Sequence, residues 1–112
     1  MKVKMSPNVA VRTSDPQKAY EFYTKILGFR HRPENKTHVD LDANAINLFI
    51  IEDTEIQGPV MELFVDDLEE AREILIQNGC KVLRWRGKGQ DCYIQDPFGI
   101  RFNIWEVKGS IR

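Results

Sequence analysis

The sequence predicts an α+β domain built from two βαβββ modules. Its 112 residues suit one compact unit, and 42% apolar with 29% charged residues is typical of a globular chain. Strand-like and helix-like patterns follow one another in the same order twice. A shift of 52 residues superposes Asp15 on Asp67, and a shift of 56 residues superposes Asn47 on Asn103. Because a module of about 50 residues buries little core alone, we expect the two to form a single domain.

The first module is expected over about residues 6–52. Alternating residues predict a strand over Asn8–Arg12, and Ser14 followed by Pro16 predicts a helix that Ser14 caps and Gly28 ends. The helical spacing defines one apolar stripe, formed by Ala19, Phe22, Tyr23, Ile26 and Leu27. Turn residues, including Pro33-Glu34-Asn35, separate three further predicted strands, at Phe29–Arg32, His38–Leu41 and Ile46–Ile51.

The second module is expected over about residues 60–107, after a polar linker at 53–59. A strand over Val60–Val65 precedes a helix that begins at Asp66-Asp67 and ends at Asn78-Gly79. The apolar stripe of this helix comprises Leu68, Ala71, Ile74 and Leu75. Three strands complete the module, at Lys81–Arg86, Gln90–Gln95 and Ile100–Glu106.

Charge and cysteine content exclude several classes of partner. Sixteen basic against seventeen acidic residues give a net charge of -1 and a pI near 6.1, so we expect neither nucleic acid nor a membrane surface as a partner. No apolar run approaches the roughly 20 residues of a membrane span. Cys80 and Cys92 lack metal-binding spacing and fit packing residues of a cytoplasmic protein.

Three segments resemble the vicinal oxygen chelate superfamily, the group of glyoxalase I, bleomycin resistance protein and extradiol dioxygenases. They are Asn8–Phe29, Leu63–Ala71 and Asp96–Glu106, and the resemblance spans nearly all of residues 1–112. It implies one domain whose paired βαβββ modules form a curved, cup-shaped mixed sheet. It also implies a ligand in the concave cup, often with a divalent metal, and a homodimer.

The resemblance places the family's metal ligands at four positions, which here are Asn8, Asn47, Val60 and Asn103. Asparagine offers a neutral carbonyl oxygen and valine offers no ligand, whereas transition metals need imidazole, thiolate or carboxylate. We therefore expect no metal and no other cofactor. A divalent metal held in another way is the alternative, and His31 with His38 on successive strands would supply two ligands for it.

Strand alternation around these positions predicts the residues that line the cup. The expected ligand-binding residues are Asn8, Arg12, Asn47, Phe49, Glu62, Phe64, Arg101, Asn103 and Trp105. Apolar walls with a few polar groups are typical of small-molecule pockets. The alternative is a filled cup, in which the aromatic rings pack together and Arg12 pairs with Glu62.

Two further features are candidates for a catalytic or a binding role. Glu62 is the one carboxylate expected in the cup, and a partly buried glutamate is a candidate general base. The segment Arg84–Gly89 places three cations and an indole at a hairpin tip, where they either clamp an anionic ligand group or remain solvated.

Three functions follow from these features. The first is a metal-free protein that binds a small molecule in the cup. The second is a metal-dependent glyoxalase-like lyase or isomerase, or a dioxygenase. The third is a regulatory module whose outer surface contacts a partner. The sequence alone leaves the identity of the ligand open.

Overall fold

The computed structural model describes residues 1–33 and 38–109 and confirms the predicted α+β class. Within them the order βαβββ occurs twice, with eight strands in mixed pairing. In chain order the elements are β1 (Val3–Thr13), α1 (Pro16–Glu21), the π-helix η1 (Phe22–Ile26), β2 (Arg30–Arg32), β3 (Val39–Asp42), β4 (Asn47–Glu52), β5 (Gly58–Val65), α2 (Leu68–Gln77), β6 (Lys81–Trp85), β7 (Cys92–Gln95) and β8 (Arg101–Glu106).

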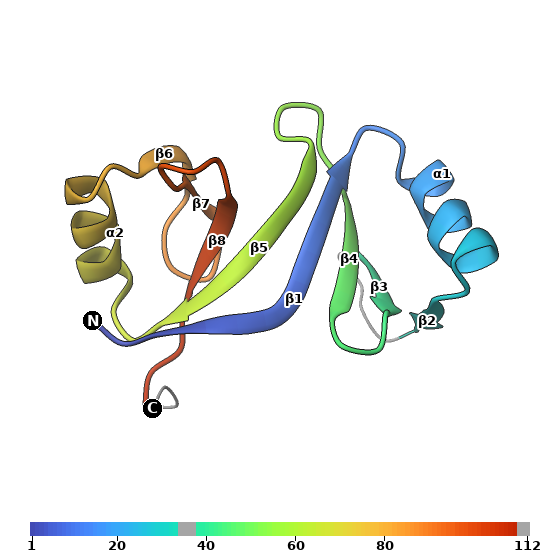
Figure 1. The fold of residues 1–112 in the computed structure, drawn as a ribbon, viewed down its shortest axis with the longest axis horizontal. Coiled ribbons are helices and arrows are strands. Elements are labelled where there is room, and N and C mark those ends of the chain that lie inside the picture. Colours follow the sequence, from blue (N-terminus) through green and yellow to red (C-terminus); the bar gives the residue numbers. More distant parts are fainter. Residues whose placement is uncertain (34–37, 110–112) are drawn as a thin grey trace. The chain divides into compact units, whose positions relative to one another are not determined.

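The chain divides into two compact units. The first unit contains Pro7–Val60, and the second joins Met1–Ser6 to the chain from Met61 onward. Figure 1 shows α1 alongside the strands of the first unit and α2 alongside those of the second. The first strand is therefore longer than predicted, and its initial residues belong to the second unit.

The sheet of the first unit has the order β2-β3-β4-β1. Strands β1 and β4 are parallel, with Asn8 opposite Asn47, and β3 is antiparallel to both β2 and β4. Because side chains alternate along a strand, Leu48 and Ile50 point to one face and Asn47 and Phe49 to the other. This is the predicted register.

The helix of the first unit packs on the apolar face of the sheet. Leu41, Leu48 and Ile50 are buried, and Tyr20 and Tyr23 pack against them. The helix is capped by Asp15, whose Oδ1 accepts from the backbone N–H of Lys18 at 3.1 Å, rather than by Ser14 as predicted. Pro16 begins the helix because its fixed φ suits the first turn and its missing N–H needs no partner there.

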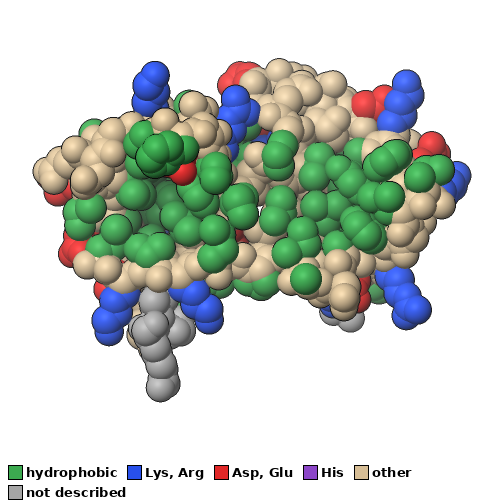
Figure 2. Space-filling view, in the orientation of Figure 1, with side chains coloured by type: hydrophobic (Ala, Val, Ile, Leu, Met, Phe, Trp, Pro, Cys, Tyr) green, Lys and Arg blue, Asp and Glu red, His purple; other side chains and the backbone are tan. Residues whose placement is uncertain are grey.

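The predicted apolar stripe of this helix is wrong at three of its five positions. Phe22, Ile26 and Leu27 are 50%, 71% and 50% exposed, whereas Tyr20 joins the core. The reason is that the second half of the helix is a π-helix, in which each hydrogen bond spans one residue more than in an α-helix. A stripe drawn at 3.6 residues per turn therefore leaves the core face. Figure 2 shows hydrophobic side chains gathered over this unit on the viewed face.

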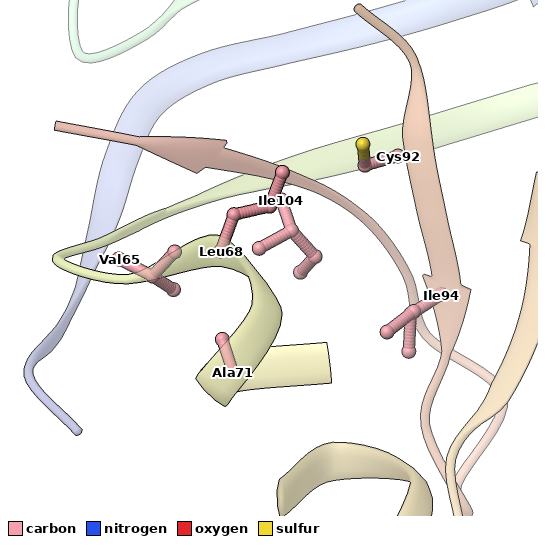
Figure 3. Packing of buried hydrophobic residues seen from close by; sticks show 6 residues of the cluster. All are labelled: Val65, Leu68, Ala71, Cys92, Ile94 and Ile104. Carbon is pink, nitrogen blue, oxygen red and sulfur yellow. The ribbon is translucent and has the colours of Figure 1, made fainter. Parts of the chain in front are cut away.

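The sheet of the second unit contains the strands β5-β8-β7-β6 in that order. Strands β5 and β8 are parallel, with Glu62 opposite Asn103, while β7 is antiparallel to β8 and β6. Figure 3 shows its buried core between α2 and the sheet, formed by Val65, Leu68, Ala71, Cys92, Ile94 and Ile104. Asp67 caps α2 by accepting from Glu70 N–H at 3.0 Å, and Gly79 follows it at a φ of +94°.

Cys80 and Cys92 are free thiols, and Cys92 belongs to the core, as expected of a packing residue. The predicted turn Pro33-Glu34-Asn35 lies mostly outside the described residues. In the described part of the chain, each helix is too short or too polar to cross a membrane.

Candidate functional site on the helix-free sheet faces

Each unit has one sheet face packed on its helix and an opposite face, which we call the helix-free face. On the helix-free face of the first unit, Asn8 and Asn47 lie opposite each other, as the resemblance implied. The Nδ2 of Asn47 donates to the Oδ1 of Asn8 at 3.0 Å. This bond orients both amides at the two family metal-ligand positions on β1 and β4.

Arg12 is held by a residue that the sequence interpretation assigned to the linker. Its Nε donates to the Oδ2 of Asp53 at 2.9 Å, and both side chains are buried. The other oxygen of Asp53 accepts from the backbone N–H groups of Glu55 and Ile56 at 2.8 and 3.0 Å. The sequence analysis did not predict Asp53 as a partner of Arg12. Arg12 is an anchored residue of the face.

His38 also belongs to this face, and the predicted ligand set did not include it. Its ring centroid lies 4.4 Å from that of Phe49, with the two planes tilted by 46°. Burial is the main cause of a lowered His38 pKa, the Asp40 carboxylate opposes this effect, and the Arg12 guanidinium adds to it. The structure therefore places a neutral imidazole beside an aromatic ring at neutral pH.

His31 lies on the opposite face of the same sheet. It pairs in register with the buried Leu41, and its ring meets Tyr20 of α1 edge-on at 5.5 Å. His38 shares a face with Asp40 and Phe49 instead, because it is an even number of residues from Asp40 on β3. The suggestion that both histidines bind one metal is therefore wrong.

On the helix-free face of the second unit, the carboxylate of Glu62 accepts hydrogen bonds from two side chains. The hydroxyl of Ser6 donates to its Oε1 at 2.8 Å, and the Nδ2 of Asn103 donates to its Oε2 at 3.4 Å. The Oδ1 of Asn103 accepts from the backbone N–H of Cys92 at 3.1 Å. Two side chains thus fix the position of Glu62. This arrangement favours a role in orienting a ligand over the role of a general base.

Three residues of this face were absent from the predicted set. The buried Tyr93 lies opposite Asn103 and Arg84, and the guanidinium carbon of Arg84 is 5.6 Å from the Tyr93 ring centroid. Gln95 lies opposite Arg101 and accepts from its Nε at 3.5 Å. Extending the alternation across the predicted hairpin of β7 and β8 would have found Tyr93 and Gln95.

The most accessible aromatic surface of this face comes from Phe64 and Trp105. They lie opposite each other on the parallel strands β5 and β8, and Trp105 is 36% exposed. An exposed indole beside a phenyl ring can take a planar ligand by stacking. The two residues adjoin Glu62 and Asn103, each two positions earlier on the same strand.

Basic side chains of the hairpin tip at Arg84–Gly89 form ion pairs with carboxylates of the same unit. Arg84 pairs with Asp91 at 3.1 Å, and Lys88 pairs with Glu106 at 3.0 Å. Trp85 lies under the guanidinium of Arg72, whose carbon is 5.2 Å from the ring centroid. These contacts favour a structural role for the segment over an anion clamp.

The residues at the four family metal-ligand positions do not fit a transition metal. Two of their amide oxygens already accept hydrogen bonds, that of Asn8 from Asn47 and that of Asn103 from Cys92 N–H. Val60 supplies no donor atom. Within residues 1–33 and 38–109, no three His, Cys, Asp or Glu side chains are grouped to hold a metal ion.

The fold and these faces define a βαβββ-repeat protein with polar and aromatic side chains opposite its helices. A family comparison makes the assignment specific: residues 7–104 match the Glyoxalase/Bleomycin resistance protein/Dioxygenase superfamily, and the chain belongs to this family. A search of curated proteins found no sequence match.

Solved structures share the fold at low sequence identity. A superfamily member from Vibrio splendidus 12B01 has a TM-score of 0.60 at 14% identity, with 94% of this chain and 99% of that chain covered. A hypothetical protein from Bacillus halodurans C-125 has a TM-score of 0.64 at 14% identity, with 100% and 99% covered. Homoprotocatechuate 2,3-dioxygenase from Brevibacterium fuscum has a TM-score of 0.61 at 18% identity, with 96% of this chain and 37% of that chain covered. These likenesses concern the fold.

Proposed function

We propose that this protein binds a small, partly aromatic molecule on its helix-free sheet faces without a metal ion or other cofactor. The observation that carries the proposal is the pair Phe64 and Trp105, with its accessible indole, next to the fixed polar pair Glu62 and Asn103. Aromatic surface supplies burial, and polar groups held in place by other side chains set the orientation of a ligand.

The absence of charged donors at the family metal positions supports the metal-free form of this proposal. A neutral amide oxygen compensates poorly for stripping water from a divalent ion. Turnover by a glyoxalase-like lyase or isomerase, or by a dioxygenase, would need a metal held by other groups. The dioxygenase likeness covers only 37% of that chain, so it supports this alternative function weakly.

Tryptophan fluorescence tests the proposal directly. The chain has two tryptophans, Trp85 and Trp105, and Trp85 is stacked under Arg72 away from the proposed site. Protein treated with EDTA is titrated with a panel of small aromatic compounds. We expect at least one compound to quench the emission of the Trp85→Phe variant and to leave that of Trp105→Phe unchanged. Quenching in neither variant by any compound would contradict the proposal.

We also propose a cytoplasmic homodimer. Two free cysteines suit a reducing compartment. The exposed side chains of Phe22, Ile26 and Leu27 are apolar surface that a second copy would cover. Light scattering should give about twice the chain mass of 13.1 kDa, and Ile26→Asp should shift it toward that of one chain. A single-chain mass for the unmodified protein would contradict the dimer.

A further inference from the structure

The initial residues of β1 extend the helix-free face of the second unit. Met1–Ser6 belong to this unit, and β1 is the neighbour of β5 in the order of the strands. Figure 1 shows the start of β1 beside the end of β5. The hydroxyl of Ser6 donates to Glu62 at 2.8 Å on the helix-free face, so even-numbered residues at the start of β1 point to that face. Lys4 is one of them.

A second contact fixes the register of Lys4. The backbone N–H of Asp66 donates to the carbonyl of Lys2 at 3.3 Å. This contact is four residues from the Ser6 contact on β1 and also four residues from it on β5. Equal spacing on the two strands means that they run antiparallel without a bulge between the contacts. Lys4 is midway between the contacts and therefore lies opposite Phe64.

Lys4, Phe64 and Trp105 consequently form one row across three neighbouring strands. Phe64 lies opposite Trp105 in the pairing of β5 and β8, so Phe64 is the middle residue of the row. Neighbouring strands are about 4.8 Å apart, which places the Cα atoms of Lys4 and Trp105 about 10 Å from each other. Both outer side chains are accessible, since Lys4 is exposed and Trp105 is 36% exposed. A flat molecule can therefore reach this row from solvent without entering the core.

The ammonium of Lys4 has no carboxylate partner among the described residues 1–33 and 38–109. The residue opposite it is a phenylalanine, which cannot neutralise its charge. Lys2, two residues earlier, lies opposite Asp66 instead. The backbone N–H of Lys2 is the main cause of a lowered Asp66 pKa, and the Lys2 ammonium adds to it. An accessible ammonium beside aromatic surface favours a ligand that combines a ring with an anionic group.

We propose that Lys4, Phe64 and Trp105 form a subsite for a planar aromatic anion, such as an aryl carboxylate. This inference rests on the proposed small-molecule binding and names the ligand class for the second unit. The aromatic plane of the ligand lies on the indole and phenyl rings, and the Nζ of Lys4 donates to its anionic group. The Glu62 carboxylate, two residues before Phe64 on the same face, repels that group and so directs it toward Lys4.

The test compares 2-naphthoate, 2-naphthamide and 2-naphthamidine, which share one ring system and carry negative, zero and positive charge. Calorimetry at pH 7.5 should show 2-naphthoate binding at least about fivefold tighter than 2-naphthamide, a factor that corresponds to about 1 kcal/mol, and 2-naphthamidine binding most weakly. Lys4→Gln removes the charge, keeps a long polar side chain and should abolish that preference. Lys2→Gln is the matched control on the same face of the same strand, and should retain it because Lys2 lies opposite Asp66.

Salt gives a second measurement that needs no variant. Raising sodium chloride from about 0.05 M to about 0.5 M screens an exposed ion pair, so it should weaken 2-naphthoate binding and leave 2-naphthamide binding unchanged. Equal affinities of the three probes, or a preference for 2-naphthoate that persists in Lys4→Gln, would overturn the subsite and leave the proposed function standing. Failure of these probes and of every other aromatic compound would overturn both.

Discussion

Arg12 and Asp53 form a buried ion pair, with the Nε of the arginine 2.9 Å from the Oδ2 of the aspartate. The pair connects β1 to the turn that follows β4, because Asp53 also accepts the backbone N–H groups of Glu55 and Ile56. One carboxylate therefore fixes the end of the first unit's sheet and the arginine on its helix-free face.

Asp53→Asn should destabilise the protein strongly. The asparagine Oδ1 can still accept the two turn N–H groups, whereas the buried guanidinium loses the charge of Asp53. Breaking a buried pair from one side typically costs about 3 to 5 kcal/mol. Urea unfolding followed by circular dichroism measures this loss, with Lys25→Ala at the exposed Lys25–Glu21 pair as the control, which should change by less than about 0.5 kcal/mol. Equal effects of the two variants would contradict the assigned role.

Asn103→Leu should destabilise the second unit by about 1 to 3 kcal/mol, the usual cost of leaving buried polar groups without a partner. The substitution removes the acceptor of Cys92 N–H and a donor to Glu62. Gln95→Ala is the control on the same face, since its bond to Arg101 is long at 3.5 Å. An unfolding free energy unchanged in Asn103→Leu would show that the network contributes nothing.

Glu106 should contribute a pH-dependent part of the stability. The backbone N–H of Leu68 and the ammonium of Lys88 lower its pKa below the ordinary value. The folded state then binds the proton less readily than the unfolded state, so the contribution is complete above about pH 4.5 and is lost as the pH falls through the lowered pKa.

The check is Glu106→Gln, which should flatten the fall in melting temperature between about pH 5 and pH 3. Glu73→Gln on α2 is the control for the general effect of removing one carboxylate. If the melting temperatures of Glu106→Gln and of the unmodified protein fell equally over this pH range, the assigned contacts would be contradicted.

Cys92 should be inert in the folded protein. It is fully buried, its pKa is raised by burial, and its Sγ donates to the carbonyl of Gly87 at 3.2 Å. Because the thiolate is the reactive form, the thiol of a Cys80→Ser variant should react with iodoacetamide at pH 7.5 at least about tenfold more slowly than in urea. Equal rates in buffer and in urea would show that this core opens freely.

Periodicity and the internal repeat predicted most of the fold because they report which face of an element is buried. They predicted which side chains of each strand share a face, and the observed pairing of Asn8 with Asn47 and of Glu62 with Asn103 agrees with that alternation. They could not reveal the π-helix, because it is defined by backbone hydrogen bonds that span one residue more, and side-chain spacing does not encode them.

The contacts within the candidate site were less predictable for another reason. Asp53 follows a strand in a polar segment, so the sequence gives no sign that it turns back to Arg12. The face on which His31 lies depends on how the short strands β2 and β3 pair, and a shift of one residue in that pairing would move it to the other face. Such long-range pairings follow from tertiary structure.

The central claim is that the protein binds an aromatic small molecule without a metal. Its most direct test is the melting temperature of EDTA-treated protein, measured alone, with the aromatic panel, and with zinc, nickel, cobalt, manganese or iron(II). A ligand that binds only the folded state must raise this temperature. We predict a rise with at least one aromatic compound and none with any metal. A rise of several degrees with one metal, and none with the aromatic compounds, would contradict the claim.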